Sequence, residues 1–260
     1  MKIASAQLEV TVGDIAENFS KHLDIIDLAI ANRVDLIVFP EMSLTGYCRE
    51  EGHELVIAPT DSRIQELKKI AETHHIIIVV GAPIEINQSL CIGAYILMPN
   101  GKTEVYAKQF LHEGEDEFYS SSFDYNPRIE WQDEVIQLAI CADIVEEQHA
   151  INAKENDCTI YIASIFYSAG GIEVGHELLS KYARGYSMQV LMSNFSGQVW
   201  GVKAGGRSGF WDENGNLISE LETKEEGLLL VEKVGQKWMA REVKGKQSID
   251  LTGASASYSD

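Results

Sequence analysis

The sequence predicts a single α/β domain with mixed sheets, from two features of its 260 residues. Short apolar runs typical of buried strands alternate with segments of helical periodicity. In addition, the pairs Asn100-Gly101 and Asn214-Gly215 each indicate a tight hairpin between strands. No linker rich in Pro, Gly or Ser divides the chain. We therefore expect one domain over residues 1–245, followed by a polar C-terminal tail over residues 246–260.

Strands and helices alternate in the first part of the chain. Strands are predicted over residues 2–10, 34–40 and 76–86, and amphipathic helices over residues 14–33 and 61–75. The first helix has apolar residues at helical spacing, namely Ile15, Phe19, Leu23, Ile26 and Ile30. Asp14 is placed to cap its N-terminus, with Glu17 in the capping-box position three residues later.

The later part of the chain mixes hairpins with further strands and helices. The predicted elements are a hairpin over 91–111, strands over 134–141, 158–165, 190–197 and 225–234, helices over 146–157 and 173–189, and a second hairpin over 205–221. This pattern again indicates an α/β domain, with sheets that are not purely parallel.

Composition disfavours several classes of partner. The net charge is −19, from 40 acidic and 21 basic residues, whereas nucleic acid and anionic membranes both attract basic surfaces. The apolar runs are far shorter than the roughly 20 residues that a membrane span needs. The N-terminal segment lacks the apolar stretch of a signal peptide. We expect a cytoplasmic protein without nucleic-acid or membrane partners.

Cysteines and histidines do not predict a metal site. The four cysteines, Cys48, Cys91, Cys141 and Cys158, are far apart and form no CxxC pair. They therefore do not resemble a disulfide framework, and the seven histidines are not at ligand spacing with them. We expect neither a bound metal nor an organic cofactor.

Three polar side chains occupy unusual positions near strand ends. Glu41 follows an apolar strand, where burial would raise its pKa and suit a general base, although it could instead be a helix N-terminal acid. Lys108 lies among apolar and aromatic residues, and it could either stabilise an oxyanion or lie on the solvent-exposed face of a hairpin. Cys141 ends a strand, where it could either act as a nucleophile or pack in the core. Base, oxyanion stabiliser and nucleophile together suffice for acyl transfer.

The motifs around these residues resemble the nitrilase superfamily of carbon–nitrogen hydrolases. The resemblance extends from residue 2 to about residue 232. It includes "DLIVFPEMSLTGY", "LMPNGKTEVYAKQFLHEGEDEFY", "LAICADI", "RGYSMQVLMSNFSG" and "GGRSGFWDENGNLISEL". The implied fold is a four-layer αββα sandwich, and the implied activity is carbon–nitrogen hydrolysis by a Glu–Lys–Cys triad.

The resemblance also implies roles for individual residues. Glu41 would be the general base, Lys108 would stabilise the tetrahedral intermediate, and Cys141 would form a thioester. A second glutamate after the lysine matches Glu115 best, with Glu113 and Glu117 as alternatives. The backbone N–H of Ala142 is a further candidate for oxyanion binding.

Other residues near these motifs bear on the substrate. Phe166 and Tyr167 follow a strand and precede a Gly-rich turn, so they either wall the pocket or belong to the core. Cys48 either borders the site or is a loop thiol. Glu146 falls where the family often has a basic residue. Acidic residues near the mouth would disfavour an anionic substrate.

The expected activity is hydrolysis of a small linear amide or N-carbamoyl compound through a cysteine acyl-enzyme, with release of ammonia. Two alternatives remain, a catalytically silent binding subunit and an acyltransferase that uses the same acyl-enzyme. The family resemblance also implies a homodimer or a larger homo-oligomer.

Overall fold

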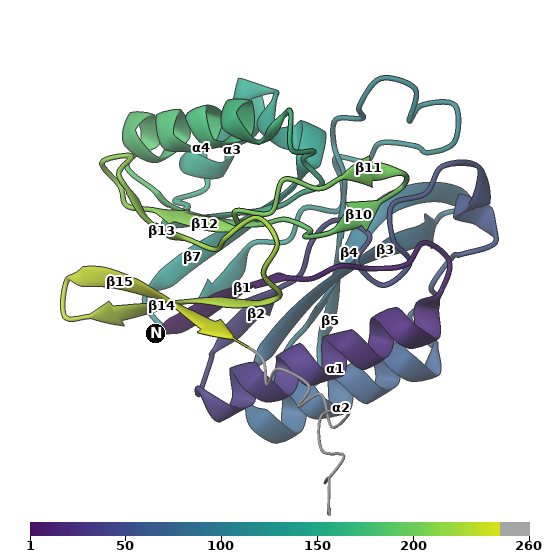
Figure 1. Cartoon of the computed structure of the whole chain (residues 1–260), viewed down its shortest axis with the longest axis horizontal. Helices are drawn as coiled ribbons and strands as arrows, with labels where there is room; N and C mark the ends of the chain where they lie inside the picture. Colours follow the sequence, from purple (N-terminus) through teal and green to yellow (C-terminus); the bar gives the residue numbers. More distant parts are fainter. Residues whose placement is uncertain (245–260) are drawn as a thin grey trace, which may run out of the picture.

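The computed structural model describes residues 1–244, and it is a four-layer αββα sandwich (Figure 1). Two β-sheets pack face to face in the middle. Helices α1 and α2 cover the outer face of one sheet, and α3 and α4 cover the outer face of the other. The predicted fold class is confirmed. The predicted tail, residues 246–260, lies outside the described residues.

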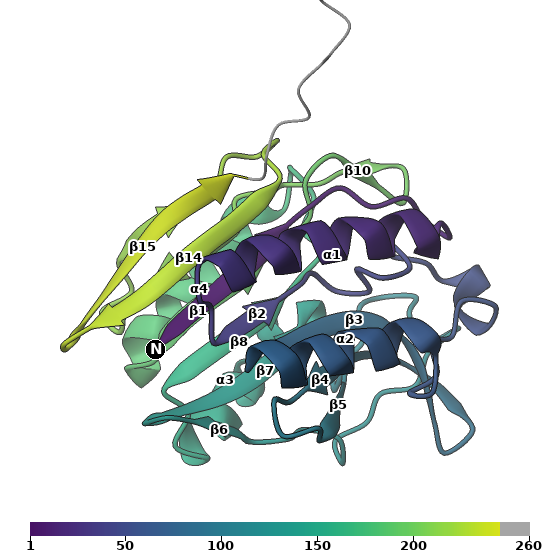
Figure 2. The same cartoon turned by 90° about the horizontal axis from the view of Figure 1, so that it is seen from below.

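The first sheet has seven strands in the order β15-β14-β1-β2-β3-β4-β5. Their bounds are β1 Lys2–Gln7, β2 Leu36–Val38, β3 Ile77–Ile86, β4 Ser89–Leu97, β5 Thr103–Ala107, β14 Gly227–Val234 and β15 Lys237–Lys244. Strands β1, β2 and β3 are parallel, and the others pair antiparallel, so the sheet is mixed as predicted. Helices α1 (Ile15–Ala31) and α2 (Ser62–His74) lie side by side across it (Figure 2).

The second sheet has six strands in the order β13-β12-β9-β8-β7-β6. Their bounds are β6 Ile129–Trp131, β7 Glu134–Ile140, β8 Ile160–Ser164, β9 Gln189–Ser193, β12 Gly209–Trp211 and β13 Leu217–Glu220. Helices α3 (Glu147–Glu155) and α4 (Ile172–Tyr186) cover it, and a small hairpin, β10 (Gln198–Val199) with β11 (Val202–Lys203), stands apart. Short 3-10 helices η1 (Glu50–His53) and η2 (Cys141–Ile144) complete the elements.

Apolar strand residues form the core on both faces of each sheet. Fully buried Ile37, Ile78 and Ile162 belong to the larger cluster, and a second cluster lies around Leu179 and Trp211 under the α3–α4 layer. Strands that are buried on both faces read as continuous apolar runs, which is why the sequence pattern located them. Hydroxyl groups join the sheets, since Ser164 Oγ donates to the carbonyl of Phe39 over 2.8 Å.

Helix α1 begins as predicted but buries polar residues that the pattern did not reveal. The Asp14 side chain caps the helix by accepting from the backbone N–H of Glu17 over 3.0 Å. The Glu17 carboxylate accepts from the Thr11 hydroxyl instead of completing a capping box. On the inner face His22 is fully buried, stacks on Phe39, and its Nε2 is 2.9 Å from the Ser43 hydroxyl.

Burial lowers the pKa of His22 to about 4, so the folded protein keeps this imidazole neutral. Between pH 6.5 and 4 the unfolded chain binds this proton more readily than the folded protein does. Lowering the pH through this range should therefore reduce the free energy of unfolding by about 3 kcal/mol through this residue. In urea denaturation at pH 7 and pH 4, His22→Gln should reduce this pH dependence. His74→Gln, a change at an exposed histidine, should leave it intact. An unchanged slope in His22→Gln would contradict the assignment.

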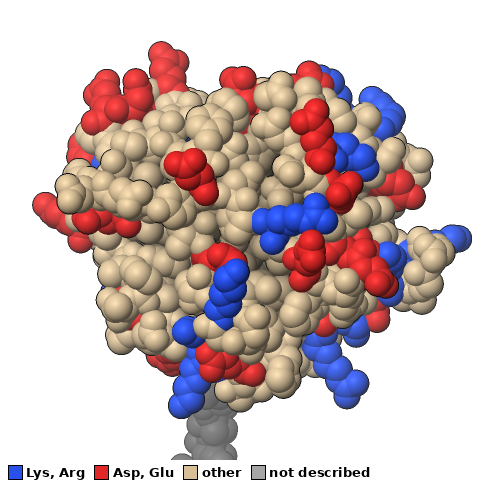
Figure 3. Space-filling model, turned by 180° about the vertical axis from the view of Figure 1, so that it is seen from behind, with Lys and Arg blue, Asp and Glu red and all other residues tan. Residues whose placement is uncertain are grey.

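Three further observations concern strand β15, the helices and the surface charge. Strand β15 was not predicted, because its weak alternation lies at a sheet edge where only β14 pairs with it. None of the helices within residues 1–244 is both long enough and apolar enough to cross a membrane. On the face in Figure 3, acidic side chains are spread over the surface with basic ones among them.

Candidate active site

Glu41 stands on a tight turn that follows β2 after Phe39 and Pro40. Next to it, Met42 adopts a left-handed backbone conformation with φ of 51°. The turn packs closely on β3 at Gly81, where an added Cβ would lie 2.4 Å from the Met42 nitrogen. Glycine is therefore required there, and the turn holds the fully buried Glu41 side chain in place.

Lys108 follows the last residue of β5 and is completely buried. The alternative of a wet hairpin face is thereby excluded. Its Nζ donates to Glu41 Oε1 over 2.7 Å and to Glu115 Oε1 over 2.9 Å. Glu115 also accepts from the Tyr47 hydroxyl and from the backbone N–H of His112. Of the three loop glutamates considered, Glu115 is thus the one that contacts Lys108.

Cys141 begins η2 at the end of β7, in a left-handed conformation with φ of 44°. This sharp strand-to-helix turn is costly for a residue other than glycine, and such strain concentrates at functional sites. The Cys141 Sγ lies 3.8 Å from the carbonyl of Phe166. The N–H groups at the start of a helix lack intrahelical acceptors, so the Ala142 N–H is suited to oxyanion binding.

Burial sets the protonation of this group. It raises the pKa of the Glu41 carboxyl to about 7, although the Lys108 charge opposes this and the Glu115 charge adds to it. Burial and the Glu41 charge raise the pKa of the Cys141 thiol. Burial alone would lower the pKa of Lys108, but the charges around it outweigh burial and raise it. Near neutral pH the site therefore holds a thiol, an ammonium group and a carboxyl poised to accept a proton.

Asp143 ties the Lys108 segment to the Cys141 turn. Its Oδ1 accepts from the backbone N–H groups of Gln109 and Phe110, over 3.0 and 2.8 Å. Its Oδ2 accepts from the backbone N–H of Ile140 over 2.8 Å and from the Tyr106 hydroxyl over 2.6 Å. One carboxylate thus fixes the residues that flank both Lys108 and Cys141.

Asp143→Asn is expected to lower the free energy of unfolding by about 3 kcal/mol, because an amide nitrogen would face two buried donors in place of an acceptor. Activity should fall with it, as the Lys108 segment shifts. Urea denaturation measures the first effect, with Asp116→Asn, the same change at an exposed loop residue, as control. A loss under about 1 kcal/mol would contradict the role assigned to Asp143.

A cavity of about 360 Å³ opens over these groups. It is lined by Glu41, Tyr47, Arg49, His112, Glu115, Cys141, Phe166, Tyr167, Ser168, Gly171, Trp200 and Val202. Of the residues predicted for the site, five line the cavity directly. Lys108 and Ala142 are not among the lining residues, but Lys108 contacts two that are, Glu41 and Glu115.

Several lining residues were missed from the sequence. Tyr47 and Arg49 flank Cys48, but Cys48 itself turns inward, is fully buried and lies 3.6 Å from the Tyr119 hydroxyl. Of the two alternatives for Cys48, the structure therefore supports a loop thiol outside the cavity, and its neighbours in "TGYCRE" line the cavity instead. Glu146 does not line the cavity, so it offers no support for the expectation that anionic substrates are disfavoured.

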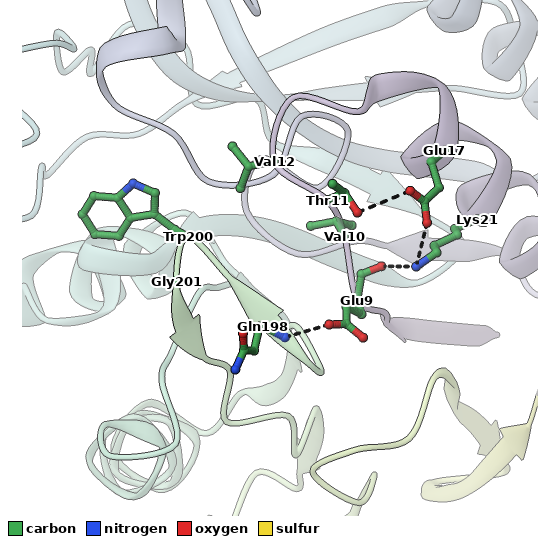
Figure 4. Close-up of a pocket in the computed structure, with 9 residues that line it drawn as sticks. All are labelled: Glu9, Val10, Thr11, Val12, Glu17, Lys21, Gln198, Trp200 and Gly201. Atoms are coloured by element: carbon green, nitrogen blue, oxygen red, sulfur yellow. Dashed lines mark hydrogen bonds and ion pairs between the residues drawn. The ribbon is translucent and has the colours of Figure 1, made fainter.

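Trp200 separates this cavity from a neighbouring one. It lies in the turn between β10 and β11 and lines both cavities, of which Figure 4 shows the neighbouring one. The neighbouring cavity measures about 590 Å³ and includes Lys21, whose Nζ donates to the carbonyl of Glu9 over 2.9 Å and lies 3.7 Å from Glu17. Its charged side chains are thus already paired, since Glu9 also accepts from the backbone N–H of Gln198.

Known proteins share this fold. An amidase from Nesterenkonia sp. superposes with a TM-score of 0.79 at 21% identity, covering 88% of this chain and 89% of that one. A mutant of the amidase from Nesterenkonia sp. AN1, with covalent addition of the acetamide moiety of fluoroacetamide at its active-site cysteine, gives 0.78 at 20% identity, with the same coverage.

The curated relatives are longer than this chain. A glutamine-dependent NAD(+) synthetase of Aquifex aeolicus is 26% identical over an alignment 273 positions long, which covers 99% of this chain and 46% of that protein. The chain thus spans less than half the length of this relative. The model of the carbon-nitrogen hydrolase family matches residues 2–236, most of the sequence, and the chain therefore belongs to that family.

Proposed function

We propose that the protein hydrolyses the C–N bond of a small linear amide or N-carbamoyl compound through a thioester on Cys141, with release of ammonia. The observation that carries this proposal is the buried group of Glu41, Lys108 and Glu115, joined by contacts of 2.7 and 2.9 Å, beside a thiol that opens on a cavity. The family membership supports it.

In the first step, Sγ of Cys141 bonds to the carbonyl carbon as its proton passes to Glu41. The thiol needs this base, because its pKa is raised and little thiolate forms unaided. Glu41 Oε2 has no hydrogen-bond partner among the described residues, so it can receive the proton. The oxyanion takes its stabilisation from the Lys108 ammonium and the Ala142 N–H.

In the second step, the tetrahedral intermediate collapses and its C–N bond breaks. The departing nitrogen takes the proton from Glu41 and leaves as ammonia, while the acyl group stays on Cys141. Water then attacks the thioester as Glu41 accepts one of its protons, and the thiolate leaves and is reprotonated. Glu115 acts as a positioning residue, because it holds the Lys108 ammonium opposite Glu41.

The structural relatives support an amide as the substrate class, since they are amidases by name and, in one of them, the acetamide moiety of fluoroacetamide is covalently added at the active-site cysteine.

A panel of primary amides, N-carbamoyl amines and nitriles tests the proposal by release of ammonia. We expect release either from amides, with one equivalent of carboxylic acid per ammonia, or from carbamoyl compounds, with one equivalent each of carbon dioxide and the free amine. Hydroxylamine added to the assay distinguishes hydrolysis from acyl transfer, since a transferase would form hydroxamate in preference to acid. Binding of these compounds with no turnover would contradict the proposal and favour a silent binding subunit.

A further inference from the structure

The cavity over Cys141 has an arginine at its wall that the proposed chemistry does not use. Arg49 lies beside two aromatic rings that contact each other, with its guanidinium carbon 4.9 Å from the centre of the Trp200 ring and 5.8 Å from that of Tyr47. Gly114 leaves room for it, because an added Cβ would lie 2.7 Å from Arg49 Nη1. The aromatic rings and the glycine thus define the position of the guanidinium.

Most of the hydrogen-bonding capacity of Arg49 is uncommitted. Its Nε donates to the Tyr47 hydroxyl over 3.0 Å, and its Nη2 donates to the carbonyl of Glu113 over 3.2 Å. A guanidinium has five N–H groups, so three remain. Within residues 1–244, Arg49 forms no ion pair with a carboxylate. A partly buried guanidinium with unused donors is well suited to a planar anion.

The other charged groups that line the two cavities are already paired. The acidic residues that line the cavity, Glu41 and Glu115, both contact the Lys108 ammonium. In the neighbouring cavity, Lys21 is paired with Glu17 and with the carbonyl of Glu9. Arg49 is therefore the positively charged residue of the cavity wall that has unused N–H donors. Exposed His112 also lines the cavity.

We propose that Arg49 binds a carboxylate of the substrate, so that the preferred substrate is a monoamide of a short dicarboxylic acid. The amide carbonyl would lie at Cys141 and the carboxylate at Arg49, on the Trp200 side of the cavity. A volume of about 360 Å³ suits a compound of this size. This inference rests on the proposed function, whose reacting groups it shares.

Matched amides test the proposal, namely succinamate and glutaramate against neutral butyramide. Binding is measured first by calorimetry in a Cys141→Ala background, where no turnover is needed, and kcat/KM is measured with Cys141 present. The acid amides should bind more tightly than butyramide. Arg49→Met should lower the ratio of acid-amide to butyramide affinity about 10- to 100-fold, and Arg49→Lys should lower it less.

The ratio of acid-amide to butyramide affinity distinguishes loss of the carboxylate contact from general damage to the site. Any disturbance that reaches Glu115 through Tyr47 affects both kinds of amide, whereas loss of the carboxylate contact affects one. Arg184→Met, which removes the same charge from the exposed surface of α4, should leave the ratio unchanged.

Two results would overturn the inference: tighter binding of butyramide than of both acid amides, or an equal ratio in Arg49→Met and the parent. Acid amides that bind through Arg49 but release no ammonia would contradict the proposed hydrolysis and leave the binding site standing. Turnover of butyramide without preference for acid amides would support the proposed hydrolysis and contradict the carboxylate site at Arg49.

Discussion

Cys141→Ala is expected to abolish ammonia release, lowering kcat by about four orders of magnitude or more. The proposed reaction passes through a bond to Sγ, and the neighbouring groups cannot replace this atom. Glu41 and Lys108 are held to each other over 2.7 Å, and neither is placed as an alternative nucleophile. Ammonia release under saturating amide, together with intact-protein mass spectrometry for the acyl adduct, measures the effect.

The matched control is Cys158→Ala, the same change at a thiol buried in the α3–α4 cluster. It should cost some stability through a small cavity but keep turnover and the adduct. Both variants should remain folded, as circular dichroism would show. If Cys141→Ala kept a tenth of the native rate, or if Cys158→Ala lost as much, the nucleophile would be misassigned.

Much of the fold was predictable because its signals are local. The apolar run before Pro40 and the Asn100-Gly101 turn report directly on a buried strand and a hairpin. Strand β15 gave no such signal, since it lies at a sheet edge and its side chains alternate only weakly in burial. Polar His22 inside α1 was equally hidden, because its partner Ser43 belongs to a turn that only the folded chain brings near.

The reacting groups were predictable as residues but not as a geometry. Glu41, Lys108 and Cys141 each stand at a strand end, where family motifs identify them. The sequence could not decide whether Lys108 faces solvent, because it lies one residue beyond β5, where strand alternation no longer fixes direction. The same limit left three loop glutamates open until the contact between Glu115 and Lys108 separated them.

The residues that would select the substrate were the least predictable. Arg49 lies in a loop after the Glu41 turn, and Trp200 lies in the β10–β11 hairpin, about 150 positions later in the chain. Their contact across the cavity is a product of loop conformation. Periodicity does not specify such conformations, and single residues in them carry no strong sequence signal.

Glu41→Gln is expected to lower kcat/KM by about three orders of magnitude at pH 8, because a glutamine cannot accept the thiol proton. The native enzyme should show the pH dependence of the same group. Since the pKa of Glu41 is raised to about 7, kcat/KM should rise about tenfold per pH unit below 7 and level off above it. This apparent pKa belongs to the coupled group that Glu41 forms with Lys108 and Glu115.

The pH profile of Glu41→Gln should lose this step, while Glu85→Gln, the same change at an exposed position on β3, should keep it. Alkylation of Cys141 by iodoacetamide gives a second readout, because its rate should follow the same apparent pKa in the native protein. A native profile that stays flat from pH 5 to 9, or a step retained in Glu41→Gln, would show that another group takes the proton. Loss of the step together with loss of rate would identify Glu41 as the base, since a merely structural role would leave the shape of the profile unchanged.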